Sequence, residues 1–177
     1  MFFPAYITLS LVAIFPWCAS ASMRPWELTR LSVSGLPWRG EEGLHEPLNT
    51  LAVEVRDPND YANSDPVVQC ITKFPYASPP YHQAFNCTEV PYGRWDFAFF
   101  PPNPPRDNAE PQYWNPGQDF TLELRLFPVS SGSWFGGRVN FSVSAGGNLR
   151  GLCSAGGVCS FMVKEELLPV YIQQKEG

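Results

Sequence analysis

Apolar and polar residues alternate most clearly over residues 119–126. The apolar side chains occupy every second position: Phe120, Leu122, Leu124 and Leu126. The positions between them are polar: Thr121, Glu123 and Arg125. Successive side chains of a β-strand point to opposite faces of the sheet, so this pattern predicts a strand with one face toward the core and one toward solvent. Glu123 is expected on the solvent face.

Seven further segments have the character of strands. Alternation as clear as the first is found at residues 51–56, 94–99 and 138–143. Weaker apolar patterns are found at residues 28–33, 67–74, 158–163 and 169–173. Segments rich in proline, glycine and asparagine separate these runs, and such residues take the chain out of a sheet. Residues 164–168 favour a short helical turn.

About seven to eight short strands with regular turns predict an all-β fold, an antiparallel β-sandwich or barrel. No linker divides the chain into two cores. We therefore expect one β domain over residues 48–172, an N-terminal extension with the first strand at residues 22–47, and a frayed tail at residues 173–177. Composition agrees, because 44% of the residues are hydrophobic, only 16% are charged, and 19 prolines disfavour long helices.

The charge balance excludes one class of function. The chain has 17 acidic and 12 basic side chains, a formal net charge of -5. A sequence-general nucleic-acid binder carries a basic excess that displaces counterions from phosphates. No nucleic-acid partner is expected.

Residues 1–21 resemble a secretory signal peptide. They contain no charged side chain, and an apolar stretch leads into Ala19-Ser20-Ala21, a small-residue cleavage site. The apolar stretch is shorter than the roughly 20 residues that span a bilayer, which argues against a membrane anchor. We expect cleavage before Ser22 and a secreted, extracellular protein with no membrane association after cleavage.

Four cysteines remain after removal of the signal peptide, and an even number in an exported chain indicates two disulfides. They are Cys70, Cys87, Cys153 and Cys159. Of the three pairings, we favour the local one, Cys70 with Cys87 and Cys153 with Cys159, because each pair brackets a turn-forming segment. A zinc site would need short C-x2-C spacings, which the sequence lacks. Two sequons, at Asn86 and Asn140, fit N-glycosylation in the same compartment.

Residues for catalysis or metal binding form no clear constellation. The two histidines, His45 and His82, lie in loop-like segments, and no serine has a G-x-S-x-G environment. A glycoside hydrolase could draw a carboxylate pair from Asp96, Asp107, Glu110 and Asp119, although nothing in their spacing selects two. Calcium could use Asp57, Asp60 and Asp65, but a turn rich in Asp and Asn explains the same residues. We predict no catalytic residue, no metal and no cofactor.

Aromatic residues in loop-like segments are the best binding candidates. Four tryptophans lie in or beside segments rich in proline and glycine: Trp26, Trp38, Trp114 and Trp134. Aromatic side chains in loops are common anchors for sugars and partner proteins. We select Trp114 with its neighbour Tyr113, and also Trp134 and Trp38, as binding residues. The alternative is that these rings cover the open ends of the sandwich.

The order of several motifs resembles a known group of proteins. It comprises a signal peptide, Val55-Arg56-Asp57, Cys70, a proline-rich stretch to Cys87, Trp95-Asp96-Phe97, Asp119-Phe120-Thr121-Leu122, and a closing Gly151-Leu152-Cys153 with Gly157-Val158-Cys159. Over residues 48–172 this order is similar to small secreted proteins of filamentous fungi, among them the Alternaria allergen-like (AA1-like) β-barrel family. The resemblance implies a disulfide-stabilised β fold without catalysis, and an allergen or effector role.

Two functions follow as expectations. The first is a secreted, non-enzymatic β-protein of a filamentous fungus, effector-like or associated with the cell wall, that binds a host protein or a cell-wall polysaccharide. The alternative is a carbohydrate-active module or glycoside hydrolase with exposed tryptophans and a carboxylate pair.

Overall fold

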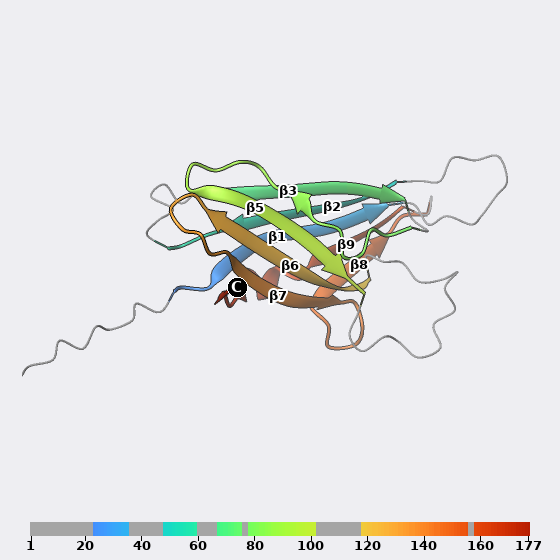
Figure 1. Cartoon of the computed structure of the whole chain (residues 1–177). Helices are drawn as coiled ribbons and strands as arrows, with labels where there is room; N and C mark the ends of the chain where they lie inside the picture. Colours follow the sequence, from blue (N-terminus) through green and yellow to red (C-terminus); the bar gives the residue numbers. More distant parts are fainter. Residues whose placement is uncertain (1–22, 36–47, 60–66, 76–77, 102–117, 156–157) are drawn as a thin grey trace, which may run out of the picture.

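The fold is a β-sandwich of two antiparallel sheets (Figure 1). The computed structural model describes residues 23–35, 48–59, 67–75, 78–101, 118–155 and 158–177. The signal peptide predicted at residues 1–21 lies outside the described residues. In the part that the structure describes, the sheets do not close into a barrel, so the sandwich alternative is the right one.

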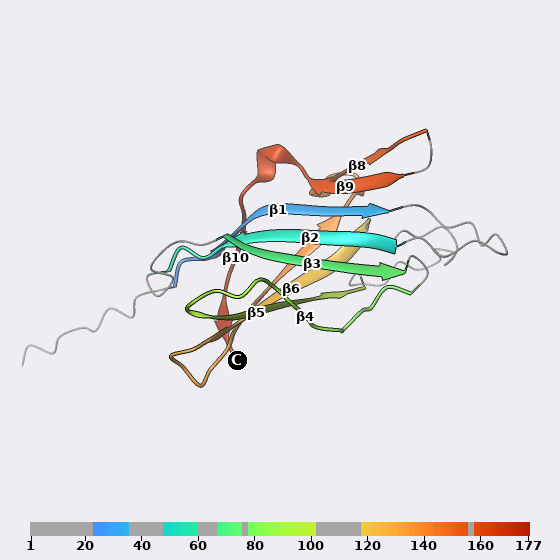
Figure 2. The same cartoon turned by 90° about the horizontal axis from the view of Figure 1, so that it is seen from above.

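The first sheet, sheet A, has its strands in the order β3-β2-β1-β9-β8 (Figures 1 and 2). Their bounds are β3 (Val67–Pro75), β2 (Leu48–Arg56), β1 (Trp26–Gly35), β9 (Cys159–Val163) and β8 (Leu149–Cys153). β10 (Val170–Ile172) also pairs with β1, at its beginning, whereas β9 pairs with the end of β1. The N-terminal strand therefore lies inside the sheet.

The second sheet, sheet B, has the order β11-β7-β6-β5-β4. Its bounds are β11 (Lys175–Glu176), β7 (Phe135–Ser142), β6 (Asp119–Pro128), β5 (Gly93–Phe100) and β4 (Phe85–Asn86). A single 3-10 turn, Glu165–Leu167, lies in the segment predicted to be a helical turn. The C-terminal segment then passes from β10 in sheet A to β11 in sheet B, which can be followed in Figure 2.

All eight predicted strands are present, and β4, β8 and β11 are additional short ones. The prediction of a frayed tail at residues 173–177 is wrong. Lys175 and Glu176 pair with Gly136 and Phe135 of β7. The polar sequence of this segment gave no periodic signal, and its strand exists because β7 offers a free edge. No helix among the described residues has the length and apolar character of a membrane span.

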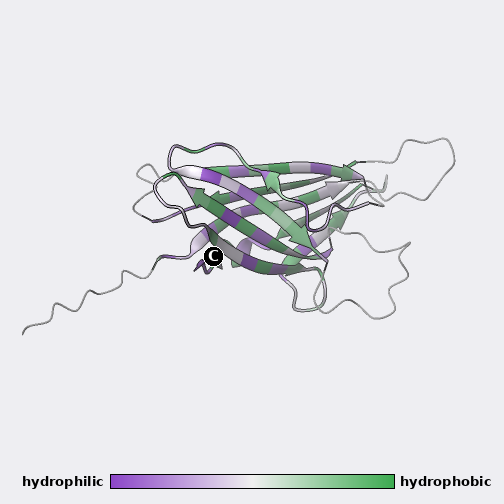
Figure 3. Ribbon diagram, viewed as in Figure 1, coloured by the Kyte–Doolittle hydropathy of each residue, from purple (hydrophilic) through white to green (hydrophobic). Residues whose placement is uncertain are grey.

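The core lies between the sheets and follows the alternation in the sequence, which is visible as alternating colours along the strands in Figure 3. The apolar positions of β6 are at most 2% exposed: Phe120, Leu122, Leu124 and Leu126. Trp26 of β1 and Trp95 of β5 meet across the two sheets, with ring centroids 4.5 Å apart. Trp26 is fully buried, so the prediction that grouped it with loop tryptophans available to a ligand is wrong.

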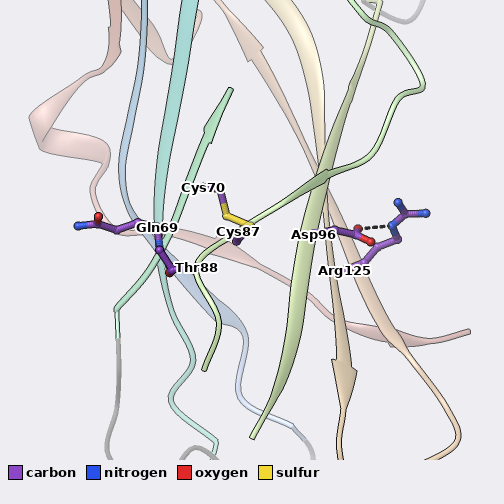
Figure 4. The surroundings of a disulfide bond; sticks show 6 residues. All are labelled: Gln69, Cys70, Cys87, Thr88, Asp96 and Arg125. Carbon is purple, nitrogen blue, oxygen red and sulfur yellow. Dashed lines mark hydrogen bonds and ion pairs between the residues drawn. A yellow bond between two sulfur atoms is a disulfide. The ribbon is translucent and has the colours of Figure 1, made fainter. Parts of the chain in front are cut away.

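Two disulfides stabilise the sandwich, with the predicted local pairing. Cys70 of β3 is bonded to Cys87, which follows β4, so this bridge joins neighbouring edges of the two sheets (Figure 4). Next to it, the Thr88 amide donates to the Gln69 carbonyl oxygen over 2.8 Å. The second bridge, Cys153–Cys159, closes the β8–β9 hairpin between residues that are direct partners in the register.

Candidate functional site

A shallow groove of about 450 Å³ lies on the outer face of sheet B, at its β7–β11 edge. We call it the Gly136 groove. Its lining comes from β6, β7 and the C-terminal segment: Glu123, Trp134, Gly136, Gly137, Arg138, Gln173, Lys175 and Glu176. It brings an indole, a guanidinium, an ammonium and carboxylates to one place, so it is the best candidate site in the described part of the chain.

Two consecutive glycines of β7 make room for the groove. A Cβ atom on Gly136 would lie 2.4 Å from the indole of Trp134, so only glycine lets the indole lie this close to the strand. A Cβ atom on Gly137, which faces the opposite way, would lie 2.5 Å from the Ile172 side chain. Gly137 therefore allows the crossing from β10 to β11 to pass close to β7. Glycine in the interior of a strand often marks such a close approach.

Trp134 forms the apolar wall of the groove, and its indole is held in place. The ring stacks on Phe127 of β6, with centroids 6.4 Å apart and planes 30° apart. The guanidinium of Arg94 lies over the same Phe127 ring, 4.7 Å from its centroid. The Gly177 amide donates to the Trp134 carbonyl oxygen over 2.9 Å. Trp134 is partly exposed, so it presents a fixed aromatic surface to a ligand.

An ion pair forms the polar end of the groove. The Arg138 side chain donates from Nε and Nη2 to the same Glu123 oxygen, over 3.1 and 2.8 Å. The Arg138 guanidinium also lies 4.9 Å from the Phe100 ring centroid, a cation–π contact. Charge-assisted hydrogen bonds of this kind are stronger than neutral ones. They fix the Arg138 side chain, of which 63% is exposed, in one position beside the groove.

The expectation that Glu123 is a freely exposed residue needs correction. Glu123 points away from the core, as the alternation predicts, but only 9% of it is exposed because Arg138 covers it. Asp96 of β5 is in the same situation. It is 5% exposed and accepts a hydrogen bond of 2.6 Å from Nε of Arg125. Two acidic groups on the outer face of sheet B, Glu123 and Asp96, thus lie beneath arginines.

Among the residues predicted to bind a ligand, only Trp134 lies in the described part of the chain, and it lines the groove. Trp38, Tyr113 and Trp114 lie outside the described residues. The remaining lining residues were not predicted from the sequence to bind a ligand. The signal that could have found them is the pair Gly136-Gly137 in the middle of an otherwise regular strand.

Both predicted glycosylation sites are exposed. Asn86 lies on β4 opposite Asp96, and Asn140 lies on β7 opposite Thr121. The Thr121 hydroxyl donates to Oδ1 of Asn140 over 2.6 Å. Because Asp96 and Thr121 both alternate with core residues, the two asparagines share the outer face of sheet B with the Gly136 groove.

Of the three aspartates considered for calcium, only Asp57 lies in the described residues, and it belongs to a structural turn. Asp57 is fully buried and accepts hydrogen bonds from Nε1 of Trp26 over 3.1 Å and from the Asn59 amide over 3.1 Å. These bonds make the Asp57–Asn59 segment an Asx turn that follows β2. Asp60 and Asp65 lie outside the described residues, and no group of metal-ligating side chains is found within them.

The two described carboxylates among the hydrolase candidates, Asp96 and Asp119, do not form a catalytic pair. Asp96 is the register partner of Arg125, and Asp119 lies six residues from Arg125 on the same strand. At about 3.4 Å per residue, the two are roughly 20 Å apart, beyond the roughly 5–9.5 Å of glycosidase pairs. Glu123 lies nearer to Asp96, but arginines hold both carboxylates. Asp107 and Glu110 lie outside the described residues.

Comparisons of the chain with protein-family models, with curated proteins and with solved structures found no match. The class that the fold defines is therefore a disulfide-stabilised β-sandwich with a groove on one face. The resemblance to AA1-like proteins stays a prediction.

Proposed function

We propose that this is a secreted, non-enzymatic binding protein that holds a polysaccharide, such as one of a cell wall, in the Gly136 groove. The observation that carries the proposal is the fixed indole of Trp134 beside the Glu123–Arg138 pair. Ligand sites combine an apolar or aromatic surface with a few well-placed polar groups. A sugar ring presents both kinds of partner, since its C–H groups pack on an aromatic face and its hydroxyls form hydrogen bonds.

Export and an effector-like role belong to the same proposal. The two disulfides support an oxidising compartment, where such bonds persist. The residues that support the secretion signal are the charge-free segment 1–21 and its Ala19-Ser20-Ala21 end.

Affinity electrophoresis in gels that contain cellulose derivatives, β-glucan, xylan or pectin tests the proposal. We expect retardation by at least one polysaccharide, and loss of about tenfold or more in affinity for Trp134→Leu. This substitution keeps an apolar contact with Phe127 and removes the aromatic surface. Tyr171→Ala is the matched control, because Tyr171 is 62% exposed on β10, in the other sheet. Thermal melts of both variants show whether they are folded.

Absence of retardation by every polysaccharide, for the glycosylated and the enzymatically deglycosylated protein alike, would refute polysaccharide binding. Deglycosylation matters because Asn140 lies only two residues from Arg138 on the same face. Release of reducing sugar by the protein would instead support the hydrolase alternative.

A host protein is the second candidate partner. Three apolar side chains are exposed on the outer face of β2 and β3: Leu48 at 55%, Val67 at 49% and Ile71 at 58%. In the register Leu48 and Val67 lie at opposite ends of the β2–β3 pair and Ile71 lies midway, so Ile71 is the central apolar group of this face. An exposed apolar face favours protein contacts. Ile71→Lys should then abolish binding to a candidate host protein in a pull-down and leave polysaccharide retardation unchanged. Unchanged protein binding would count against this face.

A further inference from the structure

We infer that the Gly136 groove takes an acidic polysaccharide whose sugar rings carry carboxylates, a polyuronate. This inference rests on the proposed function and specifies its ligand class. It follows from the charges that the sheet register places around Gly136.

Gly136 has an aromatic side chain and three cationic side chains as neighbours on the outer face. Along the chain, the next outward positions are Trp134, directly before β7, and Arg138 on β7. Across the strands, Gly136 is the register partner of Arg125 on β6 and of Lys175 on β11. Neighbouring strands lie roughly 4.8 Å apart, so Arg125 and Lys175 flank the glycine at roughly that distance between backbones. Two of these cations, Arg138 and Lys175, line the groove beside the Trp134 indole, which lies over the glycine, whereas Arg125 turns toward Asp96.

The acidic groups of this face are buried and already paired. Glu123 and Asp96 are 9% and 5% exposed and accept hydrogen bonds from Arg138 and Arg125. Arg125 uses its Nε atom for this bond, and its terminal nitrogens point away from Asp96 (Figure 4). The two terminal nitrogens of a guanidinium match the two oxygens of a carboxylate. The exposed charged side chains that line the groove are therefore Arg138, Lys175 and Glu176, and two of these three are cationic donors.

Lys175 is exposed and has no carboxylate within ion-pair distance among the described residues. Glu176 also lines the groove, but it is the register partner of Phe135, whose side chain alternates with the outward Gly136. Lys175 and Glu176 therefore point to opposite sides of β11. This makes Lys175 the cation most available to a ligand, and Glu176 a neighbour of opposite charge.

The described part of the chain has no net charge that would oppose an anionic ligand. Ten of the 17 acidic and ten of the 12 basic residues lie in the described segments, so the net charge of -5 belongs to the other seven acidic and two basic residues. Exposed charges act over a Debye length of about 8 Å at physiological salt. The charges nearest to the groove consequently decide which ligand it attracts.

A uronate unit would satisfy both parts of the groove. Its ring can pack on Trp134, while its carboxylate accepts from Lys175 and Arg138. A neutral sugar gains only the ring contact and the hydroxyl hydrogen bonds. The groove should therefore discriminate between a polyuronate and the same polymer with its carboxylates esterified.

Isothermal titration with polygalacturonate and with its fully methyl-esterified form tests this discrimination. We expect the acid form to bind at least about tenfold more tightly than the esterified form. This difference in affinity should decrease as the salt concentration is raised from about 50 to about 200 mM, because salt screens the charges. Dextran sulfate and neutral xylan are the reference polymers. Dextran sulfate should bind less tightly than polygalacturonate, because it has sulfates and lacks carboxylates.

Two substitutions of opposite charge sharpen the test. Lys175→Gln should weaken polygalacturonate binding about fivefold, whereas Glu176→Gln should strengthen it, because it removes a negative charge from the groove lining. Both residues are exposed, so neither change leaves a buried group without its partner, unlike changes at Arg125 or Arg138. Melting temperatures of both variants should match the parent protein.

Equal affinity for the acid and esterified polymers, with no effect of Lys175→Gln, would overturn the polyuronate inference and leave the proposed polysaccharide binding intact. Tighter binding of dextran sulfate than of polygalacturonate would also overturn it, because charge alone would then explain binding. No binding to any polymer would overturn both this inference and the proposed function.

Discussion

The two disulfides should contribute unequally to stability, and the difference can be worked out from the fold. Cys70–Cys87 spans 17 residues and Cys153–Cys159 spans six. In the chain-entropy model, loops of these sizes correspond to about 3 and about 2 kcal/mol. The longer bridge joins two sheets, whereas the shorter one joins register partners of a hairpin.

Burial increases the difference. Cys70 is 0% exposed, so its replacement by alanine also removes a packed sulfur, which adds about 1 kcal/mol. We expect the Cys70→Ala/Cys87→Ala double variant to lose about 4 kcal/mol of unfolding free energy. The Cys153→Ala/Cys159→Ala double variant should lose about 2 kcal/mol or less, because strand pairing already holds these two residues together.

Urea unfolding followed by tryptophan fluorescence measures both losses, since Trp26 and Trp95 are buried and report on the core. The unfolding free energy should be compared, and not the midpoint alone, because an unfolded chain without a bridge is more expanded and raises the m-value. Reduction of the parent protein should reproduce the combined loss less the roughly 1 kcal/mol of the packed sulfur, which reduction leaves in place. A Cys153/Cys159 variant that loses as much as the Cys70/Cys87 variant would refute the reasoning that the inter-sheet bridge dominates.

The two faces of β6, the Gly136 groove and the signal peptide each give a further prediction. Leu124→Ala should cost about 2–5 kcal/mol in urea unfolding because Leu124 is fully buried. Glu123→Ala should cost about 1 kcal/mol, more than a freely exposed glutamate would, because it removes the partner of Arg138; equal losses at the two positions would contradict the assigned faces. Gly136→Ala should displace the Trp134 indole and weaken polysaccharide retardation at least threefold, and unchanged retardation would show that the groove does not hold the ligand. Secreted protein from a fungal host should begin at Ser22 by N-terminal sequencing, and recovery of the full-length chain in membranes would contradict export.

The alternation of residues was sufficient to predict the core faces of the longer strands. Phe120 and Leu122 are buried because a period of two places them on one face, a local property that the sequence carries directly. The same local pattern could not predict that Glu123 is covered. Its cover, Arg138, comes from another strand, 15 residues away, and that contact depends on the register between β6 and β7.

The candidate site was less predictable than the core for the same reason. Trp134 was selected from its surroundings in the sequence, but Lys175 joins it only because β11 pairs with β7. A two-residue strand has no periodicity to detect. Trp26 was misassigned for a related reason: its partners, Asp57 and Trp95, are distant in sequence and are brought to it by the pairing of β1 and by the packing of the two sheets.

The passage of the C-terminal segment from sheet A to sheet B has a consequence for the order of folding. The beginning of β1 pairs with β10, where Trp26 is the register partner of Ile172. This pairing can form only after the segment that contains Ile172 has been synthesised. Contacts between residues so far apart in sequence form slowly, and a chain emerging from the ribosome supplies its C-terminal residues last. Lys175 follows directly, and the groove is complete only when β11 is in place. A chain without β11 would therefore lack Lys175 and Glu176, and with them one side of the Gly136 groove.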